Sequence, residues 1–351
     1  MKISSSNQCD LRVLVTGGAG FIGGALIRRL LSQTSVTVFN LDKIGYASDL
    51  RGINTFLKKN NIKNRYYLFK EDLYNKEKLD ELILTIDPDL VFHLAAESHV
   101  DKSIQGPEIF LRSNILGTFN LLEVLRKHWE KLSHDRRNNF RFLHVSTDEV
   151  YGSLEKDNKF NEKSQYAPRS PYSASKASSD HLVMAWFHTY GFPALITNCS
   201  NNYGPWQFPE KLIPLAISKA IEEKPIPMYG DGKQIRDWLY VEDHIDALLL
   251  ASEKGLIGES YCIGGYGERT NDDVLRSICT ILDELRPRNE SYVHLITSVK
   301  DRLGHDRRYA INSSKIQYEL GWKAKMDFAE GLKMTVKWYL SNVNWLNKKI
   351  K

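Results

Sequence analysis

Hydrophobic and polar positions follow two alternating patterns over the first two hundred residues of the chain. Short apolar runs occupy residues 11–16, 36–42, 66–70, 90–94, 142–146 and 194–198. Between these runs apolar residues recur at helical spacing, as at Phe21, Ala25, Leu26 and Leu30. Strand and helix in alternation predict an α/β fold of the Rossmann type, a doubly wound parallel sheet with helices on both faces. Such sheets bind ligands beyond the carboxyl ends of their strands, so the residues just after each run matter most.

The pattern changes after about residue 201, where prolines stand at positions 205, 209, 214, 225 and 227 and strand signals become shorter. We predict that residues 1–200 form the Rossmann domain and that residues 201–351 form mainly a smaller, substrate-binding domain over its mouth. A strand-like run at residues 260–263 is predicted to return to the large sheet. A later segment near residues 240–265 would then complete the first domain. Residues 131–139 are polar and are predicted to form a surface loop.

Composition narrows the class of protein without deciding its chemistry. The 351 residues are 42% hydrophobic and 26% charged, ordinary values for a globular chain of about two domains. A net charge of +5 is too small to indicate nucleic acid as a partner. The four cysteines, at 9, 199, 262 and 279, show no metal-ligand or disulfide spacing, so we expect no metal site and a reducing compartment. No secretion signal or membrane span is recognisable, and a cytoplasmic protein is expected.

A glycine-rich turn comes directly after the first apolar run. Gly17, Gly20 and Gly23 give the spacing G-x-x-G-x-x-G, and with Gly18 the chain also satisfies G-x-G-x-x-G. Such a turn lets the backbone approach a pyrophosphate, which the N–H groups at the start of the next helix then bind. Asp42 ends the second run about 20 residues later, where a carboxylate binds both ribose hydroxyls of NAD and repels the extra phosphate of NADP. The positive charge of Lys43 beside it slightly weakens this preference for NAD over NADP.

Other residues near this turn allow two interpretations. The glycines alone are also compatible with a tight strand–helix turn that binds nothing, but the strand before them and Asp42 after them favour a dinucleotide. Asp72 stands after the third run and either hydrogen-bonds the adenine or caps a helix. Leu94, Ala95 and Ala96 end the fourth run with small side chains, as a cofactor lying across the sheet requires.

Tyr172 and Lys176 stand four residues apart, directly after Pro171. Proline is favoured in a first helical turn, so both side chains are predicted on one face near a helix start. A phenol has a pKa near ~10, too high for a base at neutral pH. We expect the ammonium of Lys176 and the positive nicotinamide ring to lower it. This pair is common in structural roles, but after a dinucleotide turn it indicates an oxidoreductase step.

The fifth run ends in Thr147-Asp148-Glu149. At that edge of the sheet Thr147 can hydrogen-bond the substrate hydroxyl that Tyr172 deprotonates. Hydride transfer alone needs only a hydroxyl, a phenol and an amine, so the two acids indicate further proton transfers. One acid would remove a proton from carbon and the other would protonate a leaving hydroxyl. A solvated loop is the alternative, which the neighbouring Thr147 and Tyr172 make less favourable.

Several segments together resemble the extended short-chain dehydrogenases/reductases, and within them the dTDP-glucose 4,6-dehydratase family. The resemblance covers about residues 11–322. Its most specific segments are residues 94–101 (LAAESHVD), 146–152 (STDEVYG), 201–212 (NNYGPWQFPEKL), 230–238 (GDGKQIRDW) and 304–309 (GHDRRY). The chain departs from the family pattern at Ile44-Gly45 and at Leu303, near binding loops.

The resemblance implies a dehydration that NAD makes possible and that regenerates it, so the protein should hold NAD tightly. Tyr172 would take the C4 hydroxyl proton while NAD⁺ accepts the C4 hydride. Glu149 would remove the C5 proton, Asp148 would protonate the departing C6 hydroxyl, and the hydride would return to C6. The product class is a 4-keto-6-deoxy sugar, of the kind that supplies rhamnose. Catalytic residues are thus expected to be Thr147, Asp148, Glu149, Tyr172 and Lys176.

The resemblance also implies two sets of binding residues and a homodimer. The cofactor set is Gly17, Gly20, Phe21, Ile22, Gly23, Asp42, Lys43, Asp72, Leu73, Leu94, Ala95, Ala96, Ser98, Ser113, Asn114, Tyr172, Lys176 and Asn202. The dTDP-sugar set is Ser98, Thr147, Asn201, Lys211, Leu212, Pro227, Met228, Tyr229, Arg236, Asn271, Arg302 and His305. Arginines suit a diphosphate and a tyrosine suits stacking on a base. The dimer face would join the apolar helix after Pro171 to the helix over residues 110–125, although burial within one subunit explains the same residues.

Three other functions remain open on the sequence. A nucleotide-sugar 4-epimerase would share the glycine turn, Thr147, Tyr172 and Lys176, but has no use for the acid pair at 148 and 149. A dehydratase of UDP- or CDP-linked hexoses would differ only in the pocket for the base. A silent NAD-binding scaffold would not need the proton-transfer residues.

Overall fold

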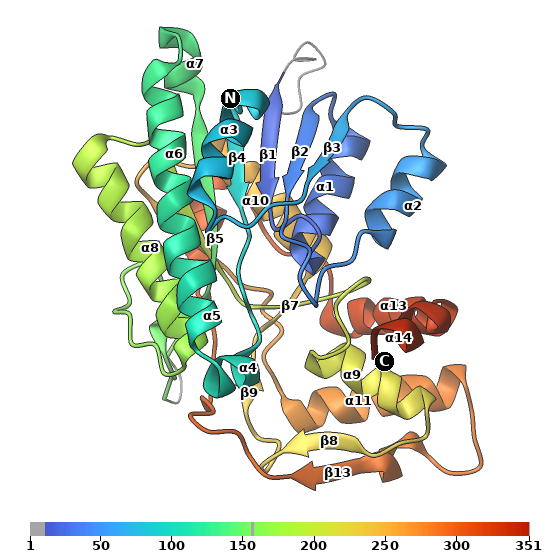
Figure 1. Ribbon diagram of the computed structural model, residues 1–351. Coiled ribbons are helices and arrows are strands. Elements are labelled where there is room, and N and C mark those ends of the chain that lie inside the picture. The colour runs from blue at the N-terminus through green and yellow to red at the C-terminus, as the bar shows by residue number, and fades with distance from the viewer. Residues whose placement is uncertain (1–10, 156–157, 351) are drawn as a thin grey trace.

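The protein is described by a computed structural model at residues 11–155 and 158–350, with side chains placed up to residue 346. At its centre lies a parallel sheet of seven strands (Figure 1). In spatial order the strands are β11 (Ser260–Ile263), β6 (Ala194–Cys199), β5 (Arg141–Thr147), β4 (Leu90–His93), β1 (Arg12–Thr16), β2 (Thr37–Leu41) and β3 (Tyr66–Phe69). The Rossmann-type sheet that the alternating pattern predicts is therefore confirmed. Cys9 and the start of the chain lie outside the described residues.

Both faces of the sheet are apolar because successive side chains of a strand point in opposite directions. Val13 and Val15 of β1 belong to one buried cluster, and Leu14 between them belongs to another. Leu143 and Phe142 of β5 divide in the same way. A strand buried on both faces reads as a continuous apolar run, which is why the runs could be recognised from the sequence.

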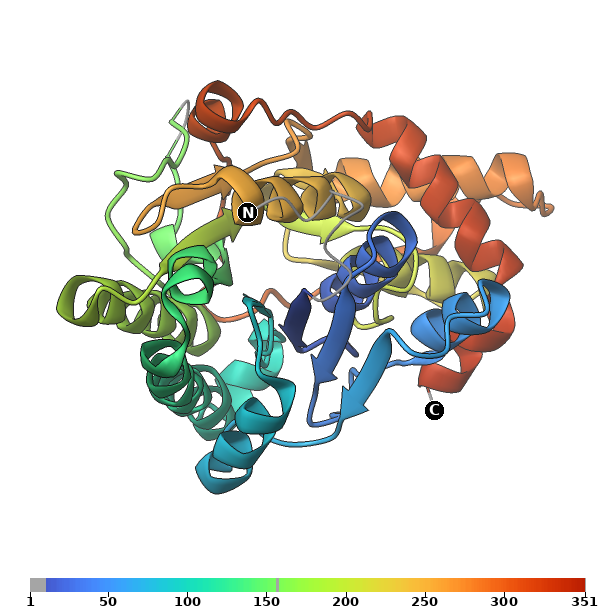
Figure 2. The same ribbon diagram turned by 90° about the horizontal axis from the view of Figure 1, so that it is seen from above.

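Helices cover each face, as the view from above shows (Figure 2). One layer consists of α3 (Lys76–Ile86), α6 (Gly117–Lys131) and α8 (Pro171–Tyr190). The other consists of α1 (Phe21–Gln33), α2 (Arg51–Lys59), α10 (Val241–Lys254) and α12 (Ser314–Leu320). Shorter segments beside the first layer are α4 (Val100–Gln105), α5 (Glu108–Phe110), the π-helical η1 (Leu111–Leu116) and α7 (His134–Asn139). None of the described helices is both long and apolar enough to cross a bilayer.

Most predicted elements are found within one or two residues of their expected bounds. Among them is the run at 260–263, which forms β11 and pairs with β6. Three segments differ from the prediction. The polar segment 131–139 is not a simple loop, because residues 134–139 form α7 and Arg136 pairs with Asp87 and Asp89. The helix expected over 110–125 is interrupted by the π-helical η1. α12 packs on the sheet although the sequence places it far beyond the first domain.

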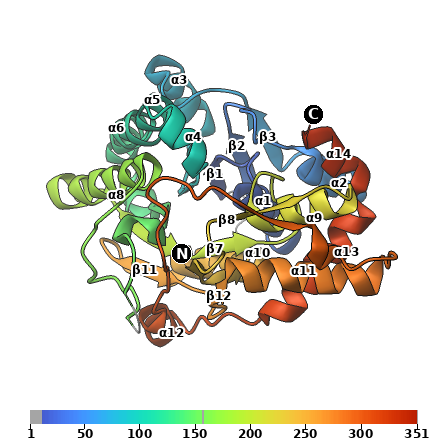
Figure 3. The same cartoon turned by 90° about the horizontal axis from the view of Figure 1, so that it is seen from below.

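The remaining C-terminal elements surround a separate apolar cluster below the sheet (Figure 3). They are α9 (Leu212–Ile221), β8 (Ile226–Tyr229), β9 (Ile235–Arg236), β12 (Arg269–Thr270), α11 (Asn271–Leu285), η3 (Tyr292–Leu295), β13 (Ile296–Val299), α13 (Phe328–Ser341) and α14 (Val343–Ile350). β8 pairs with β13 and β9 pairs with β12. A short pair of strands, β7 (Asn201–Tyr203) and β10 (Trp238–Tyr240), connects the two parts of the chain.

Candidate active site

A cavity of about 320 Å³ lies at the carboxyl ends of β1, β2, β4, β5 and β6. The glycine turn lines one part of it, and Thr147, Asp148, Glu149, Tyr172 and Lys176 line another. The same cavity is lined by the predicted residues Phe21, Ile22, Asp42, Lys43, Asp72, Leu73, Leu94, Ala95, Ala96, Ser98, Ser113, Asn201, Asn202 and Lys211. Residues from distant positions of the chain thus meet in one place because parallel strands end at one edge.

The geometry of the glycine turn leaves no room for side chains. Gly17 has φ of 72°, and a Cβ there would lie 2.7 Å from the backbone of Ala95. A Cβ on Gly23 would lie 2.4 Å from the carbonyl oxygen of Gly17. No side chain of the described residues caps the start of α1, so its first N–H groups are open to a ligand in the cavity. An uncapped helix N-terminus of this kind fits the pyrophosphate of a dinucleotide.

Asp42 is buried and fixes the shape of this end of the cavity. Its carboxylate accepts hydrogen bonds from Ala19 N (2.9 Å), Ile44 N (2.8 Å) and Ser48 Oγ (3.1 Å). Two oxygens offer about four acceptor positions, so capacity remains for a ribose hydroxyl. Lys43, which the sequence gives as slightly weakening the preference for NAD over NADP, forms an ion pair, with its Nζ 2.6 Å from Glu97 Oε1.

Three other predicted cofactor residues have contacts within the protein. Asp72 lines the cavity, and its carboxylate accepts from Tyr74 N at 3.0 Å; it does not cap α3, whose N-cap is Asn75. Asn202 also lines the cavity, with Oδ1 bonded to His244 at 2.8 Å. Asn114 does not line it and instead bonds Glu97 and Ser175.

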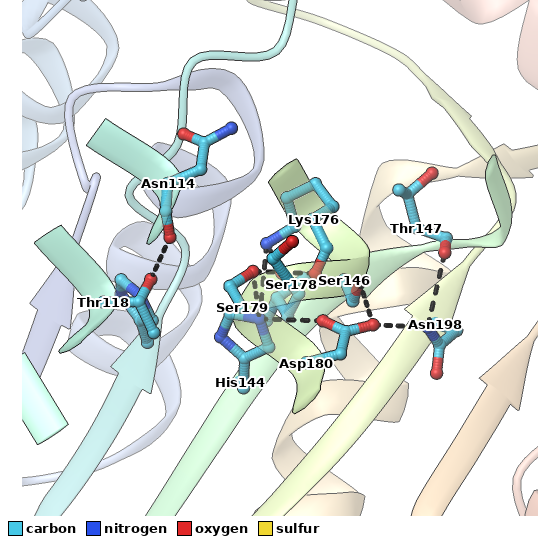
Figure 4. A network of polar contacts seen from close by, with 12 residues as sticks. Asn114, Thr118, His144, Ser146, Thr147, Lys176, Ser178, Ser179, Asp180 and Asn198 are labelled. Atoms are coloured by element: carbon cyan, nitrogen blue, oxygen red, sulfur yellow. Dashed lines mark hydrogen bonds and ion pairs between the residues drawn. The ribbon is translucent and has the colours of Figure 1, made fainter. Parts of the chain in front are cut away.

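The catalytic candidates come from the end of β5 and the start of α8. Ser170 caps α8 through a reciprocal pair of hydrogen bonds with Ser173, and Pro171 is the next residue, so the helix begins where the sequence predicts. Thr147 ends β5 and its hydroxyl donates to Asp148 Oδ1 at 3.3 Å. Lys176 is buried and donates to Val145 O at 3.1 Å. Figure 4 shows Lys176 above Ser179, His144 and Asp180, and Thr147 to the right, beside Asn198.

The two adjacent acids have different electrostatic surroundings. Burial raises the pKa of Asp148 well above its usual value, and the charges of Glu149 and Asp237 raise it further. Burial also raises the pKa of Glu149, but Lys211 and Arg236 oppose that rise. Two adjacent carboxyl groups whose surroundings shift their pKa values unequally are the arrangement that separates an acid from a base.

The expectation that Lys176 lowers the pKa of Tyr172 is not met by the residues of this chain alone. Burial raises the pKa of the phenol well above its usual value, and the carboxylate of Glu149 adds to the rise. A hydrogen bond with Thr147 opposes it. The sequence could not indicate this balance, because it depends on how completely water is excluded from the site.

The remaining predicted substrate residues do not line this cavity. They are Leu212, Pro227, Met228, Tyr229, Arg236, Asn271, Arg302 and His305. Arg302 lies 4.8 Å from the centre of the Tyr229 ring and 3.1 Å from Asp101 Oδ1. The charges of Arg236 and Arg302 both act on Glu149, which places these cations toward the acid pair.

Several cavity residues were missed on the sequence. They are Tyr46, Ser146, Cys199, Ser200, Gln207, Phe208 and Glu210, among others. Glu210 accepts from Tyr46 OH at 3.0 Å, and its neighbour Lys211 donates to Ser98 O at 2.7 Å. Glu210 stands inside the segment 201–212 that carried the resemblance, so its position was the available signal. In the described part of the chain no three acidic, His or Cys side chains are grouped to hold a metal ion.

Comparison with known proteins identifies the family. Residues 14–335 match the model of a family described as GDP-mannose 4,6 dehydratase. A dTDP-glucose 4,6-dehydratase of Salmonella typhimurium is 53% identical over 346 residues, which cover 96% of this chain and 95% of that protein.

Solved structures agree at the level of the fold. DesIV of Streptomyces venezuelae, a dTDP-glucose 4,6-dehydratase crystallised with NAD and TYD bound, gives a TM-score of 0.86 at 38% identity, covering 97% of this chain and 100% of that one. A UDP-glucose 4-epimerase of Thermotoga maritima gives 0.81 at 26% identity, covering 94% and 99%. The epimerase shares the fold, whereas the dehydratases share the sequence over nearly its whole length. The chain belongs to the dTDP-glucose 4,6-dehydratase family.

Proposed function

We propose that this protein converts dTDP-glucose to dTDP-4-keto-6-deoxyglucose with loss of one water, using NAD that it retains and recycles. The observation that carries the proposal is the pair Asp148 and Glu149 in the same cavity as Thr147, Tyr172 and Lys176. A C4 oxidation needs only the last three. Elimination across C5 and C6 needs, in addition, one base and one acid.

The glycine turn fits the cofactor. The uncapped start of α1 would bind the pyrophosphate, and Asp42 would bind the adenosine ribose. Bound NAD⁺ supplies the hydride acceptor for the oxidation at C4, and in its reduced form the donor for the reduction at C6. We further propose that residues 1–200, completed by the segment near 240–265, form the unit that holds it, and that residues 201–351 mainly bind the sugar nucleotide.

The proton transfers are assigned from the charges in the cavity. Tyr172 takes the proton of the C4 hydroxyl, assisted by Thr147. Glu149, whose ionised form Lys211 and Arg236 favour against the effect of burial, removes the C5 proton that the new ketone acidifies. Asp148, neutral because it is buried, protonates the C6 hydroxyl as it leaves as water. When the hydride returns to C6, Glu149 gives its proton back to C5. Tyr172 has then gained one proton and Asp148 has lost one, so a proton transfer from Tyr172 to Asp148 resets the site.

The sugar nucleotide is proposed to bind between the acid pair and the C-terminal elements. Arg236 and Arg302 would pair with the diphosphate, Tyr229 would stack on the base, and Asn201, with an unpartnered buried side-chain oxygen, would bond the sugar. Leu212, Pro227, Met228, Asn271 and His305 complete the proposed site. The 4-epimerase is the second candidate on fold alone, but it leaves Asp148 without a use.

The protein is proposed to act as a homodimer. Phe119 of α6 and Trp186 of α8 pack edge to face at 5.8 Å, and Trp186 packs on Tyr190 at 5.6 Å. Leu116 stands one helical turn before Phe119 and is 45% exposed. Apolar side chains continued along one face in this way are typical of a protein–protein interface. The proposed product also fits a cytoplasmic location and a role in supplying deoxysugars of the rhamnose type.

The substrate assignment is tested by incubating the purified protein with dTDP-, UDP- and CDP-glucose separately and weighing the products. We expect loss of one water from the dTDP sugar. Deuterium placed at C4 should appear at C6 of the same product molecule. A galactose epimer formed without loss of water would contradict the proposal and favour an epimerase, and faster turnover of another nucleotide would correct the base.

The role of Glu149 is tested by Glu149→Gln, which keeps the shape of the side chain and removes the base. We expect turnover to fall roughly 10²–10⁴-fold, the usual effect of losing a positioned general base. Oxidation at C4 should still occur, because Tyr172 remains, and single-turnover absorbance at the NADH wavelength measures it. Tyr172→Phe is the matched control, in which that absorbance should be lost; a wild-type rate in Glu149→Gln would remove Glu149 from the mechanism.

The burial of Asp148 predicts a stability that depends on pH. Because its pKa is raised in the folded protein, folding favours the neutral carboxyl, and ionisation destabilises the fold as pH rises above the unfolded pKa of about 4. Asp148→Asn should therefore melt at least about 2 °C higher than the wild type at pH 8, with the gain disappearing near pH 4. Thermal melting across pH measures this.

Asp231→Asn serves as the control for that measurement. Asp231 is exposed and its pKa is lowered by Arg307, so its ionised form is the favoured one and its removal should give no gain at pH 8. An equal gain in both variants would mean that the effect comes from net charge and not from burial.

The dimer face is tested by Leu116→Asp, which places a charge on the α6–α8 surface. We expect the wild type to sediment as a dimer and the variant as a monomer with little change in melting temperature. Leu256→Asp, at a leucine that is 60% exposed in the loop after α10, is the control and should remain dimeric. A monomeric wild type would refute the proposal.

A further inference from the structure

A carboxylate that the mechanism does not use lies one helical turn beyond Lys176. Asp180 of α8 is 1% exposed, and four side chains of the surrounding elements contact it (Figure 4). Ser146 Oγ donates at 2.7 Å and Tyr166 OH at 2.9 Å, both to Oδ2. Asn198 Nδ2 donates to Oδ2 at 3.3 Å, and His144 Nε2 lies 3.0 Å from Oδ1. Donors on both oxygens are what an ionised carboxylate requires.

None of these four donors carries the positive charge that a buried carboxylate needs. Burial, together with the charge of Lys176, lowers the pKa of His144 to about 4, so His144 is neutral at neutral pH. The cation that remains is Lys176, whose Nζ lies 3.4 Å from the same His144 Nε2. Lys176 and Asp180 thus both contact one imidazole nitrogen, and all three residues are buried.

Lys176 in turn depends on Asp180. Its surroundings are His144 of β5, His93 of β4, Cys199 of β6, and Tyr172 and Asp180 of its own helix. Burial holds His93 neutral and raises the pKa of Cys199 to about 12, so neither offers a negative charge. Within the described residues, Asp180 is the only carboxylate whose charge raises the pKa of Lys176 against the effect of burial.

We propose that Asp180 is a positioning residue of the reaction: its charge, acting across the neutral imidazole of His144, keeps Lys176 in the charged form. The proposal rests on the proposed function, which gives Lys176 its role beside Tyr172. His144 Nε2 cannot donate to Asp180 and accept from Lys176 at the same time. When His144 Nε2 donates to Asp180, Lys176 keeps its hydrogen bond to Val145 O. The other ammonium protons of Lys176 are then available to groups in the cavity that Lys176 lines.

The first test is the pH profile of Asp180→Asn. The amide keeps an acceptor for Ser146 and Tyr166 and can turn its NH₂ toward His144, which accepts in its other tautomer. Opposite charges about 6 Å apart in a poorly solvated site shift a pKa by about 1–2 units. We therefore expect the alkaline fall of kcat/KM to begin about 1–2 pH units lower in the variant. A uniform loss at every pH, with the profile unmoved, would overturn the proposal.

Tyr166→Phe is the matched control. It removes one donor to the same carboxylate and leaves the charge of Asp180 in place. Its alkaline limb should coincide with that of the wild type. A shift equal to that of Asp180→Asn would show that packing around the carboxylate, and not its charge, sets the profile.

The second test needs no substrate and compares melting temperatures in two backgrounds. Lys176→Met leaves Asp180 without its cation, so adding Asp180→Asn should then cost less stability than it costs the wild type, or increase stability. Equal losses in the two backgrounds would overturn the proposal. If Asp180→Asn alone does not fold, the double variant should fold; failure of the double variant where Lys176→Met folds would also overturn it.

These readouts separate the inference from the proposed function. A wild type that does not dehydrate dTDP-glucose would refute the function while the stability comparison still measured the pairing of Lys176 with Asp180. A wild type that does dehydrate it, with no coupling between the two residues, would refute only the inference.

Discussion

Exclusion of water from the carboxyl ends of β5 and β6 is the constraint on which the chemistry of this protein depends. Asp148, Lys176 and Tyr172 are all nearly inaccessible, so each has its charged form disfavoured. For Asp148, the proposed general acid, this effect is useful, because a general acid must be protonated before it acts. For Lys176 it is harmful unless a counter-charge is present. The same desolvation therefore explains why Asp148 needs no buried cation beside it, whereas Lys176 needs a buried carboxylate.

Charges brought from the C-terminal part of the chain complete the site. Arg236 lowers the pKa of both Asp148 and Glu149, and at Glu149 Lys211 and Arg302 add to this effect. The pKa values of these two consecutive carboxyl groups thus differ, because the cations of the C-terminal part of the chain act on them unequally. The sheet supplies the rigid edge and the buried residues, and the C-terminal elements supply the positive side of the cavity. Neither part alone makes an acid and a base.

The sequence predicted the sheet, the glycine turn and the start of α8 well, because each rests on local pattern. Strands buried on both faces are continuous apolar runs, and Ser170 with Pro171 determines where α8 begins. It could not predict contacts between distant residues. Glu97 neutralises Lys43, and α12 reaches back to the sheet from residue 314. The residues of this chain alone raise the pKa of Tyr172, an effect of burial that cannot be read from the spacing of two residues.

The fold does not by itself choose between reactions, as the likeness to an epimerase at a TM-score of 0.81 makes plain. Both chemistries begin with the same oxidation and need the same hydroxyl, phenol and amine at the end of the sheet. The fate of the oxidised sugar then depends on whether a base and a proton donor face the carbons next to the new ketone. A carboxyl group as buried as Asp148 is costly to keep where it has no proton to give. Its presence beside Thr147, within a cavity that also contains Glu149, is therefore the physical argument for elimination.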